Sequence, residues 1–386
     1  MKLEVPPARV FQSFWMGGFE CSSHINSRGV RLDMTASIQH DKQADGDYAR
    51  LRRMGIQTAR DGLRWHLIEK SGKYDFSSLL PMVKAAEKHG VQIIWDLFHY
   101  GWPDDLDIFT PAFLDRFTRL CRAAARVIRE NSGGIPFYTP VNEINFLAWA
   151  ATRGLMYPYA YGRDAELKRQ LVRAYIAGCE AVWSVDSRAR IVSAEPVIHT
   201  IPPRGKPEHA QEAAVQRASQ FEAWDMLGGR WEPELGGAPK YLDIVGVNYY
   251  VANQWEHPGG VRLRWDAGPL DERWLPFHCM LAEVYSRYHR PVFIAETGHY
   301  GSGRAAWLHE IAAEVYQARM SGIPVEGVCL YPILDRHDWE NPRHWHNCGL
   351  WDFKLDPKGT QRRVLNREYA AELKSAQRLL AELGCH

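Results

Sequence analysis

The stretch that decides the fold runs from QIIWDLF at residues 92–98 to FYTPVNE at residues 137–143. Both runs are short, apolar and rich in residues that favour strands. Between them, apolar side chains recur with the 3.6-residue period of a helix, at Phe113, Phe117, Leu120, Ala124, Val127 and Ile128. Thr110 and Pro111 suit the N-cap and the first turn of this helix. The stretch therefore predicts a strand, a helix and a second strand, which is the unit that builds a parallel sheet.

The same alternation extends along the chain in both directions. Eight runs have the length and composition of strands: FWMGGF (14–19), TARDGLRW (58–65), QIIWDLF (92–98), FYTPVNE (137–143), RIVSAEP (190–196), IVGVNYY (244–250), VFIAETG (292–298) and GVCLYPIL (327–334). A second clear helix, with Leu308, Ile311 and Val315 on one face, ends before Gly322 and the eighth run. Eight parallel strands close a barrel. We therefore expect an α/β protein, a single (β/α)8 TIM barrel over residues 1–386.

Extended loops are expected after two of these strands. One follows the fifth strand, from about residue 197 to 243, and the other follows the eighth, from about 335 to 356. No break in composition and no fixed-period repeat divides the chain. The barrel is therefore expected to be the one catalytic domain.

Composition narrows the classes of partner. The formal net charge is +1 and the pI is about 7.7, so no single-sign field attracts nucleic acid or an anionic membrane. No apolar run approaches the roughly 20 residues of a membrane span, and the start of the chain lacks the apolar stretch of a secretory signal. Seven cysteines without paired spacing fit a reducing compartment. We expect a cytoplasmic protein with a neutral small-molecule partner, and the 15 Trp and 17 Tyr are compatible with sugar stacking.

Polar side chains collect at the carboxyl ends of the predicted strands, where the loops of a barrel build an active site. They are Arg60, Asp96, His99, Asn142, Glu143, Glu195, Asn248, Tyr250, Glu296 and the segment from Tyr331 to Trp339. A buried carboxylate is costly unless it is paired or hydrogen-bonded. The recurrence of such groups at one end of the sheet therefore favours a catalytic cavity over isolated ion pairs that close the barrel.

Two carboxylates from different strands suit hydrolysis of a glycosidic bond. One must protonate the leaving oxygen, while the other attacks or stabilises the positive charge that develops on the sugar. We expect Glu296 to be ionised beside Arg60, and Glu143 to be protonated because of burial and its negative neighbour. In a retaining enzyme the two carboxyl groups lie roughly 5 to 5.5 Å apart.

These motifs resemble the clan A glycoside hydrolases, and most closely the family 1 β-glycosidases, over nearly the whole chain. TPVNEIN resembles the Asn-Glu strand of the family, which implies Glu143 as acid/base and Asn142 as the ligand of the sugar 2-hydroxyl. IAETG resembles the nucleophile strand and implies Glu296, with Arg60 as the arginine beside it. The resemblance implies a β-glucosidase-like enzyme that acts on O-glycosyl bonds.

Two further segments carry the same resemblance. LFHYGWP is similar to a family segment whose histidine, here His99, binds a sugar hydroxyl. GVNYY matches a tyrosine-bearing sixth strand, which implies that Asn248 and Tyr250 line the site and that Tyr250 hydrogen-bonds the nucleophile. The order and spacing of the motifs, rather than any single one, make the resemblance strong.

The sequence departs from the family where the family holds the nonreducing sugar. In YPILDRHDW, Tyr331 stands for a platform Trp and Asp338 for a Glu that binds distal hydroxyls, while Trp339 is retained. His24 occupies the place of a sugar-binding Gln, and Tyr100 replaces the Trp after the histidine. Because Asp is one methylene shorter than Glu, stacking and hydrogen-bond reach should differ. The resemblance therefore does not extend to glucose specificity.

Two local features have alternative interpretations. HDWENPRHWHNC holds ligand types of a metal site, at His337, His344, His346 and Cys348, but the spacing matches no familiar zinc pattern and loop packing explains it as well. We expect no metal and no cofactor. Glu195 is either a third site carboxylate, which binds substrate or tunes Glu143, or the partner of a nearby arginine.

Several functions are compatible with these residues. The first is an exo-acting retaining β-glycosidase that works through a covalent glycosyl-enzyme. The second is a transglycosidase, or a hydrolase of an unusual glycoconjugate, that uses the same two glutamates. A third is a noncatalytic carbohydrate-binding barrel, which retention of the full polar set disfavours, and a barrel metallohydrolase is more distant still.

Overall fold

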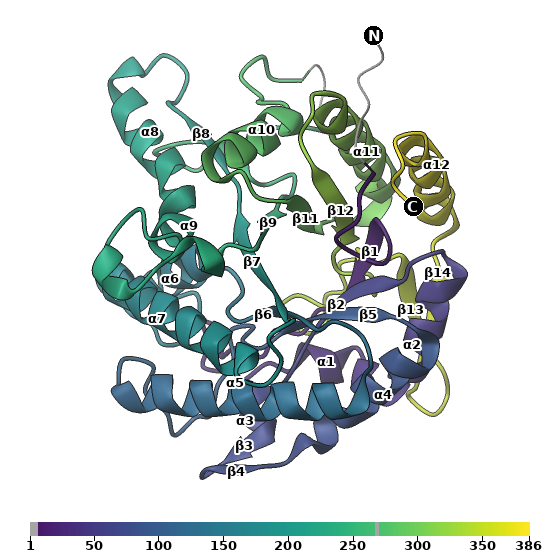
Figure 1. Ribbon diagram of the computed structural model, residues 1–386. Coiled ribbons are helices and arrows are strands. Elements are labelled where there is room, and N and C mark those ends of the chain that lie inside the picture. The colour runs from purple at the N-terminus through teal and green to yellow at the C-terminus, as the bar shows by residue number, and fades with distance from the viewer. Residues whose placement is uncertain (1–6, 267–269) are drawn as a thin grey trace.

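A closed barrel of eight parallel strands forms the centre of the molecule, in the order β1-β12-β11-β9-β7-β6-β5-β2 (Figure 1). The computed structural model describes residues 7–266 and 270–386. The strands are β1 Trp15–Gly18, β2 Thr58–Gly62, β5 Gln92–Asp96, β6 Phe137–Thr139, β7 Arg190–Pro196, β9 Ile244–Asn248, β11 Val292–Thr297 and β12 Val325–Leu330. Each of the eight predicted runs contains or overlaps one of them. The predicted (β/α)8 barrel is confirmed.

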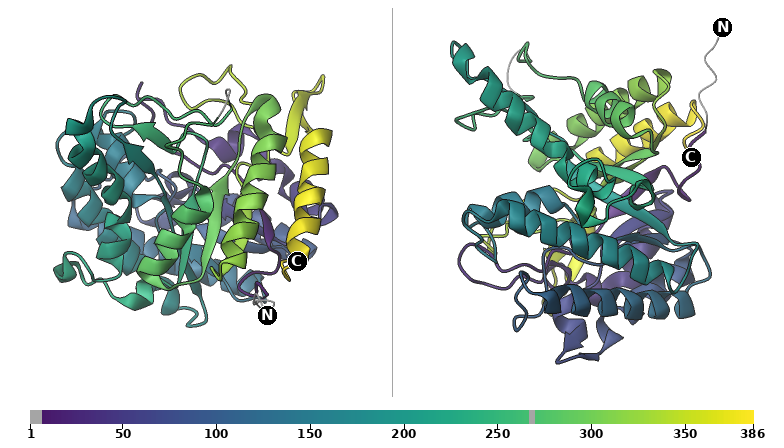
Figure 2. Two further views of the ribbon diagram at one scale, coloured as in Figure 1. Left: turned by 90° about the horizontal axis from the view of Figure 1, so that it is seen from above. Right: turned by 60° about the vertical axis from the view of Figure 1, so that its left-hand side comes forward.

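Helices surround this barrel and run alongside its strands (Figures 1 and 2). The longer ones are α2 His40–Arg53, α4 Leu80–His89, α5 Pro111–Asn131, α7 Asp164–Trp183, α10 Phe277–Tyr288, α11 Arg304–Met320 and α12 Arg367–Ala381. The shorter ones are α1 Met34–Ser37, α3 Trp65–Ile68, α6 Ile144–Thr152, α8 Ala210–Ala218 and α9 Glu222–Leu227. The two helices predicted from periodicity are α5 and α11. Thr110 is the N-cap residue of α5, but its hydroxyl donates to the Asp107 carbonyl at 2.7 Å instead of capping the helix.

The apolar core has an inner and an outer part because side chains alternate along each strand. The outer part fills the space between strands and helices. The inner part fills the barrel with Met16, Ile94, Phe137, Val192, Ala194, Ile244, Phe293, Ala295, Cys329 and Tyr331. Phe11 packs against this inner part, with ring centroids 5.3 Å from Phe137 and 5.0 Å from Phe293. The barrel interior is therefore a packed core, and chemistry is confined to the carboxyl ends of the strands.

Three small pairs of strands decorate the barrel. They are β3 Glu69–Lys70 with β4 Lys73–Tyr74, β8 His199–Ile201 with β10 Gln254–Glu256, and β13 Trp351–Leu355 with β14 Gln361–Leu365. The connection after β7 carries β8, α8 and α9. The loop predicted from about 335 to 356 ends earlier than expected. Its last part, WDFKL, forms β13, which pairs with β14. It is a strand because it pairs with β14 over five residues.

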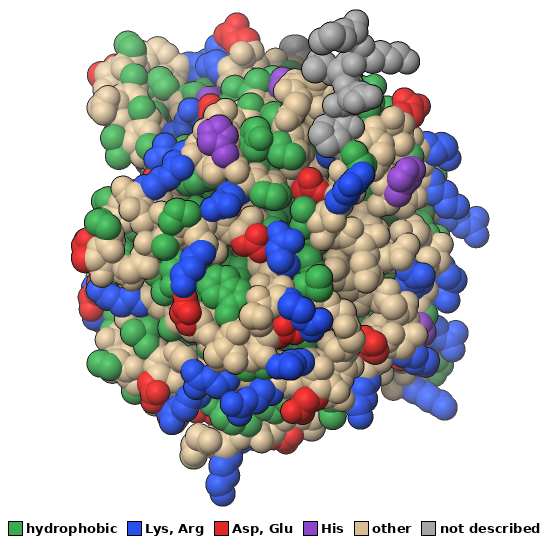
Figure 3. Space-filling model, viewed as in Figure 1, with side chains coloured by type: hydrophobic (Ala, Val, Ile, Leu, Met, Phe, Trp, Pro, Cys, Tyr) green, Lys and Arg blue, Asp and Glu red, His purple; other side chains and the backbone are tan. Residues whose placement is uncertain are grey.

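The surface carries acidic and basic side chains together on the face shown in Figure 3. This mixture agrees with the formal net charge of +1. Among the described residues, no helix combines the length and the apolar character needed to cross a membrane.

Candidate active site

Glu143 lies at the turn between β6 and α6. Its backbone has a left-handed φ of 49°, which L residues rarely adopt and which often marks a functional site. Its N–H donates to the Ala194 carbonyl of β7 at 3.0 Å, and its carbonyl accepts the Leu147 N–H at 2.9 Å, which begins α6. The turn is therefore fixed on both sides, and it holds Glu143 at the carboxyl end of the barrel.

Glu195 of β7 supports this turn. Its two carboxylate oxygens accept the backbone N–H groups of Ile144 at 2.7 Å and Asn145 at 3.0 Å. Free N–H groups at a helix start attract a carboxylate, which explains the placement. Burial, followed by the negative charge of Glu143, raises the pKa of Glu195 well above its ordinary value, although both backbone hydrogen bonds oppose this rise.

This arrangement corrects the expectations for Glu195. No arginine pairs with it among the described residues, so the structure does not have the ion pair that was one of the two alternatives for Glu195. Its side chain is 1% exposed and both of its oxygens are occupied by backbone, so direct contact with substrate is not what the geometry offers. Glu195 instead holds the start of α6 behind Glu143.

The Glu143 carboxyl group accepts two hydrogen bonds from neutral side chains. Asn248 Nδ2 donates to Oε1 at 2.8 Å, and the Tyr100 hydroxyl donates to Oε2. No arginine or lysine contacts Glu143 among residues 7–266 and 270–386. Burial, and then the negative charge of Glu296, raise the pKa of Glu143 to about 7. The group is therefore poised to give and take a proton near neutral pH.

Glu296 lies at the end of β11, where the strand register shifts. Ile294 faces Val247 of β9 while Glu296 already faces Asn248, so one extra residue is inserted at Ala295. Such a bulge re-aims the following side chain. Ala295 belongs to the inner core, and the bulge allows the next side chain, Glu296, to reach the interior as well.

The environment of Glu296 differs from that of Glu143. Arg60 Nη1 donates to Oε1 at 3.0 Å, and the Tyr250 hydroxyl donates to Oε2 at 2.8 Å. Burial raises the pKa of Glu296, while Arg60 and Tyr250 stabilise its ionised form. The two carboxylates remain slightly accessible, at 8% for Glu143 and 6% for Glu296, so both can meet a ligand.

Arg60 connects the polar groups at the base of the site. Its Nη2 donates to Asp96 Oδ2 at 2.8 Å and to Asn142 Oδ1 at 3.0 Å, and its Nη1 also donates to the Ala295 carbonyl at 2.9 Å. Asp96 raises the pKa of this buried guanidinium against the opposing effect of burial, with Glu296 contributing in the same direction. Arg60 therefore remains a fixed positive charge beside Glu296.

His99 lies beside this network. Its Nδ1 is 3.1 Å from Asp96 Oδ2, and its Nε2 is 3.4 Å from Asn142 Nδ2. Burial opposes its protonation, but the contact with Asp96 outweighs burial and raises the pKa of His99. Cys21 Sγ lies 3.3 Å from His99 Nδ1.

Cys21, Asp96 and His99 form the one group of metal-ligand types that lies close enough together in the described part of the chain. Arg60 already donates to the Asp96 oxygen that this group would use. Burial raises the pKa of the Cys21 thiol well above its ordinary value, which disfavours the thiolate that a metal requires. The donor set therefore does not fit a cation.

Aromatic side chains cover the other side of the site. The centre of the Tyr331 ring lies 5.6 Å from the Arg60 guanidinium. It lies 6.3 Å from the centre of the His99 ring, and the planes of these two rings differ by 6°. Gly18 allows this approach, since a Cβ there would meet the Tyr331 ring at 2.1 Å. The His24 ring lies edge-on to Trp339 at 4.6 Å, and burial lowers the pKa of His24 to about 3.

Some polar atoms of the site residues have no hydrogen-bond partner, as is true of other buried atoms of the chain. Buried atoms without a hydrogen-bond partner include His24 Nδ1, Asp96 Oδ1, Asn248 Oδ1, Tyr331 Oη and Trp339 Nε1. Such atoms are rare in folded proteins and mark sites with a role beyond packing. The structure brings the twelve predicted site residues to the carboxyl end of the barrel, with Glu195 behind Glu143.

The Asp338 carboxylate has its partners within its own loop. Its Oδ1 accepts the N–H groups of Glu340 at 2.7 Å and Asn341 at 2.9 Å, and its Oδ2 lies 3.3 Å from His346 Nε2. These contacts stabilise the loop after β12 rather than present the carboxylate to the other site residues. The histidines of this segment also pack within it: His337 lies edge-on to Trp345 at 5.4 Å.

The sequence prediction missed an ion pair next to the aromatic side chains. Arg336 Nε lies 3.3 Å from Glu20 Oε2, and the Arg336 guanidinium lies 5.3 Å from the Trp339 ring. Burial acts against ionisation of Glu20, but Arg336 outweighs it and lowers the pKa of this carboxyl. The sequence did offer a signal for Glu20. It lies two residues after β1, and the other polar site residues also lie at or just after the end of a strand.

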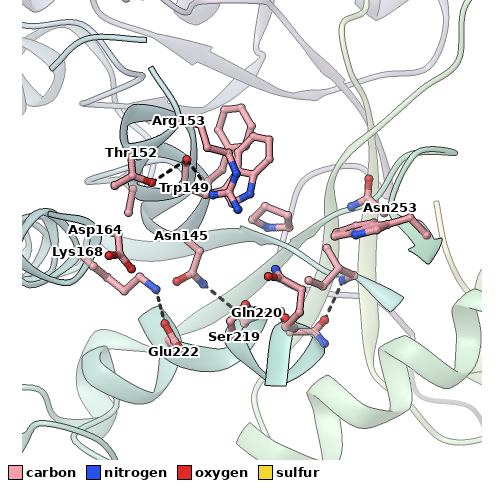
Figure 4. A pocket seen from close by; sticks show the side chains of 16 residues that line it. Asn145, Trp149, Thr152, Arg153, Asp164, Lys168, Ser219, Gln220, Glu222 and Asn253 are labelled. Atoms are coloured by element: carbon pink, nitrogen blue, oxygen red, sulfur yellow. Dashed lines mark hydrogen bonds and ion pairs between the residues drawn. The ribbon is translucent and has the colours of Figure 1, made fainter. Parts of the chain in front are cut away.

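A cavity of about 530 Å³ lies along α6, on the side that faces α7, α8 and α9 (Figure 4). Figure 4 shows Trp149 of α6 and Arg153, which directly follows α6, on one side and Asn253 on the other. Phe146 also lines the cavity. The centroid of its ring lies 5.7 Å from that of Tyr100, 6.5 Å from that of Trp339 and 5.9 Å from that of Trp149. A series of aromatic rings, Tyr100, Phe146 and Trp149, therefore leads from Glu143 into the cavity.

No protein-family model and no curated protein sequence matches the chain. Among solved structures, the chain is similar to a β-glucosidase from Thermotoga maritima in complex with glucoimidazole, with a TM-score of 0.77 and 14% identity over 98% of this chain and 100% of that chain. It is also similar to the β-glycosidase from the hyperthermophile Thermosphaera aggregans, with a TM-score of 0.70 and 16% identity over 89% of this chain and 88% of that chain. A family 1 β-glucosidase from Thermotoga maritima has a TM-score of 0.70 and 16% identity over 89% of this chain and 87% of that chain. At these identities the likeness shows that the chain has the fold of family 1 β-glucosidases.

Proposed function

We propose that the chain is a retaining, exo-acting β-glycosidase, with Glu143 as acid/base and Glu296 as nucleophile. The observation that supports this most is the different environment of the two carboxylates. Glu143 has neutral donors and a pKa of about 7, whereas Glu296 has Arg60 and Tyr250 against its oxygens. Separation of proton affinities within one site is how paired carboxylates take different roles.

The proposed reaction has two displacements. In the first, protonated Glu143 gives its proton to the glycosidic oxygen while a Glu296 oxygen attacks the anomeric carbon, and the leaving group departs as an alcohol. In the second, ionised Glu143 takes a proton from water, the water oxygen bonds to the anomeric carbon, and the Glu296 carboxylate is released. Two inversions give a product of the original configuration. Arg60 and Tyr250 stabilise the negative charge of Glu296 at both ends of the sequence.

The surrounding residues have binding roles in this proposal. We assign the 2-hydroxyl to Asn142 and other sugar hydroxyls to His99 and His24. Tyr331 and Trp339 supply ring faces for the sugar, and the substrate is a small neutral carbohydrate or glycoside. The chain then works as one catalytic domain, whose connections after β7 and β12 shape the substrate site.

The leaving group is proposed to occupy the cavity along α6 (Figure 4). The cavity begins at Asn145 and Phe146, directly after the acid/base. Trp149 is 39% exposed at this cavity, with the Arg153 guanidinium 4.7 Å from the centre of its ring, and the two side chains could contact a sugar or an aryl group together. The same cavity favours transglycosylation as the second candidate, since an acceptor alcohol held there would compete with water. Analysis of products with an added acceptor separates the two reactions.

Release of a chromophore from a panel of aryl β-glycosides tests the proposal. We expect turnover by the natural protein and loss of it in Glu296→Gln, which keeps the size of the side chain. Glu234→Gln is the matched control, because Glu234 is an exposed glutamate of the segment Pro233–Leu235 and is not one of the site residues. Binding of sugar without turnover of any glycoside would instead support a noncatalytic barrel.

A further inference from the structure

Tyr100 lies directly after His99 and is held rigidly. Its backbone is left-handed, with φ of 68°, and its side chain is 2% exposed. The ring packs edge-on to His99 at 4.6 Å and to Trp339 at 6.3 Å, and lies 5.7 Å from Phe146. These contacts leave the hydroxyl one position, between Asn142 and Glu143.

The hydroxyl completes a chain of hydrogen bonds. Asn142 Nδ2 donates to Tyr100 Oη at 3.0 Å, and Tyr100 donates to Glu143 Oε2. From Asn142 the chain continues through Arg60 to Glu296, at 3.0 Å in each step. The other donor to Glu143, Asn248, does not extend such a chain, because its Oδ1 has no partner. Tyr100 is therefore the side-chain link between the two carboxylates.

We propose that Tyr100 is a positioning residue for Glu143, which fixes its carboxyl group, stabilises its ionised form and links it to the Asn142 amide. The inference rests on the proposed function. A donor that itself accepts a hydrogen bond is polarised and donates more strongly. A substrate hydroxyl that draws Asn142 Nδ2 away therefore weakens the donation from Tyr100 and shifts Glu143 toward the protonated form that the first displacement needs.

The groups that face Glu143 set the direction of this effect. Glu296 on β11 disfavours its ionised form, and Glu195 on β7 lies behind it as a second acidic neighbour. Tyr100 favours the ionised form, as do Asn248 on β9 and then His99 after β5, each to a smaller extent. Burial and the charge of Glu296 outweigh these three effects, so the pKa of Glu143 is raised to about 7. Removal of the Tyr100 hydroxyl removes the largest of the opposing effects, so the pKa should rise further.

The test is a titration of the Glu143 carboxyl group by carbon-13 NMR in the free full-length protein, in the natural chain and in Tyr100→Phe. We expect the midpoint to rise by about one pH unit, a tenfold gain in proton affinity. Tyr138→Phe is the matched control, since Tyr138 is a buried tyrosine of β6 whose hydroxyl has no partner. An unchanged midpoint in a folded Tyr100→Phe protein overturns the proposal.

A second variant reports in the opposite direction without a change of packing. Site-specific replacement of Tyr100 by 3,5-difluorotyrosine makes the hydroxyl a stronger donor, so the Glu143 midpoint should fall. If Tyr100→Phe does not fold, this variant decides alone, and a midpoint that rises or stays overturns the proposal.

Activity separates this inference from the proposed function. In an active enzyme, Tyr100→Phe should lower kcat roughly tenfold for poor leaving groups and move the alkaline limb of kcat/KM to higher pH. A change in KM alone, with an unchanged alkaline limb, makes Tyr100 a substrate contact and overturns the inference. If no glycoside is turned over while the titration responds as expected, the proposed function fails and the positioning of Glu143 by Tyr100 stands.

Discussion

The Arg60 guanidinium donates to Glu296 Oε1 over 3.0 Å, whereas Glu143 receives hydrogen bonds only from neutral side chains within the described residues. Burial raises the pKa of both carboxyls, but Arg60 and Tyr250 favour the ionised form of Glu296, whereas the charge of Glu296 disfavours that of Glu143. An ionised carboxylate can attack an anomeric carbon, and a protonated one can assist departure of the leaving group. The predictions for Glu143 and Tyr250 below depend on this difference in environment.

Glu143→Gln should affect substrates according to their leaving groups. General acid help is worth about 10² to 10⁴ in rate, and activated aryl glycosides need little of it. We expect a loss of that size in kcat/KM for alkyl glycosides and a much smaller one for dinitrophenyl glycosides. Steady-state kinetics on both series measures it. Equal losses on the two series would contradict the acid role.

The pH dependence should report Glu143 directly. The first displacement needs the protonated form, and the pKa of Glu143 is raised to about 7. Therefore kcat/KM should fall as pH rises through about 7. The profile of Glu143→Gln on an activated substrate should lack this alkaline limb. An alkaline limb that persists in the variant would assign the titration to another group.

Tyr250→Phe tests the stabilisation of Glu296. The Tyr250 hydroxyl donates to Glu296 Oε2 at 2.8 Å, and a hydrogen bond to a charged group contributes roughly 1.5 to 3 kcal/mol. We expect kcat/KM to fall by roughly 10- to 100-fold and the acid limb to move to higher pH, since loss of the donor raises the pKa of Glu296. An acid limb that stays in place, measured beside the Tyr138→Phe control, would separate Tyr250 from the ionisation of Glu296.

Glu195→Gln tests the support of α6. The Glu195 side chain accepts two backbone N–H groups, but a glutamine amide has only one oxygen acceptor. One of the two buried N–H groups therefore loses its hydrogen-bond partner in the variant. We expect a loss of about 1 to 3 kcal/mol in the free energy of unfolding, measured with urea beside Glu234→Gln. Unchanged stability, with sugar binding lost, would return Glu195 to the substrate-contacting role.

His40 should make the stability of the barrel depend on pH. Its ring nitrogens lie 2.9 Å from Asp47 Oδ2 and 2.8 Å from Asp61 Oδ2, and these acids raise its pKa to about 9 against burial. Because the pKa of His40 in the folded protein lies above the ordinary histidine value of 6.5, the stabilisation is fully present below pH 6.5 and is lost as pH rises through about 9. The loss amounts to about 3 kcal/mol. Urea unfolding from pH 6 to 10 should show it, and His40→Gln should flatten the decline.

The barrel could be predicted because each of its strands is an apolar run between amphipathic helices, and a polar residue after such a run marks the carboxyl end. Glu143 and Glu296 followed from that rule. β13 was missed because its stability comes from pairing with β14, which no local pattern records. The backbone partners of Glu195 and Asp338 could not be predicted, because residue type alone does not reveal which N–H groups a carboxylate accepts. The bond from Tyr100 to Glu143 joins two loops and needs coordinates.

Capture of the covalent intermediate tests the central claim most directly. A 2-deoxy-2-fluoro glycoside with an activated leaving group slows the second displacement, so the glycosyl-enzyme accumulates. Mass spectrometry of the digested protein should show one added fluorosugar on the peptide that contains Glu296, and proton NMR of the unlabelled reaction should show the β anomer as the first product. A label on another residue, or a first product of the α configuration, would contradict the account.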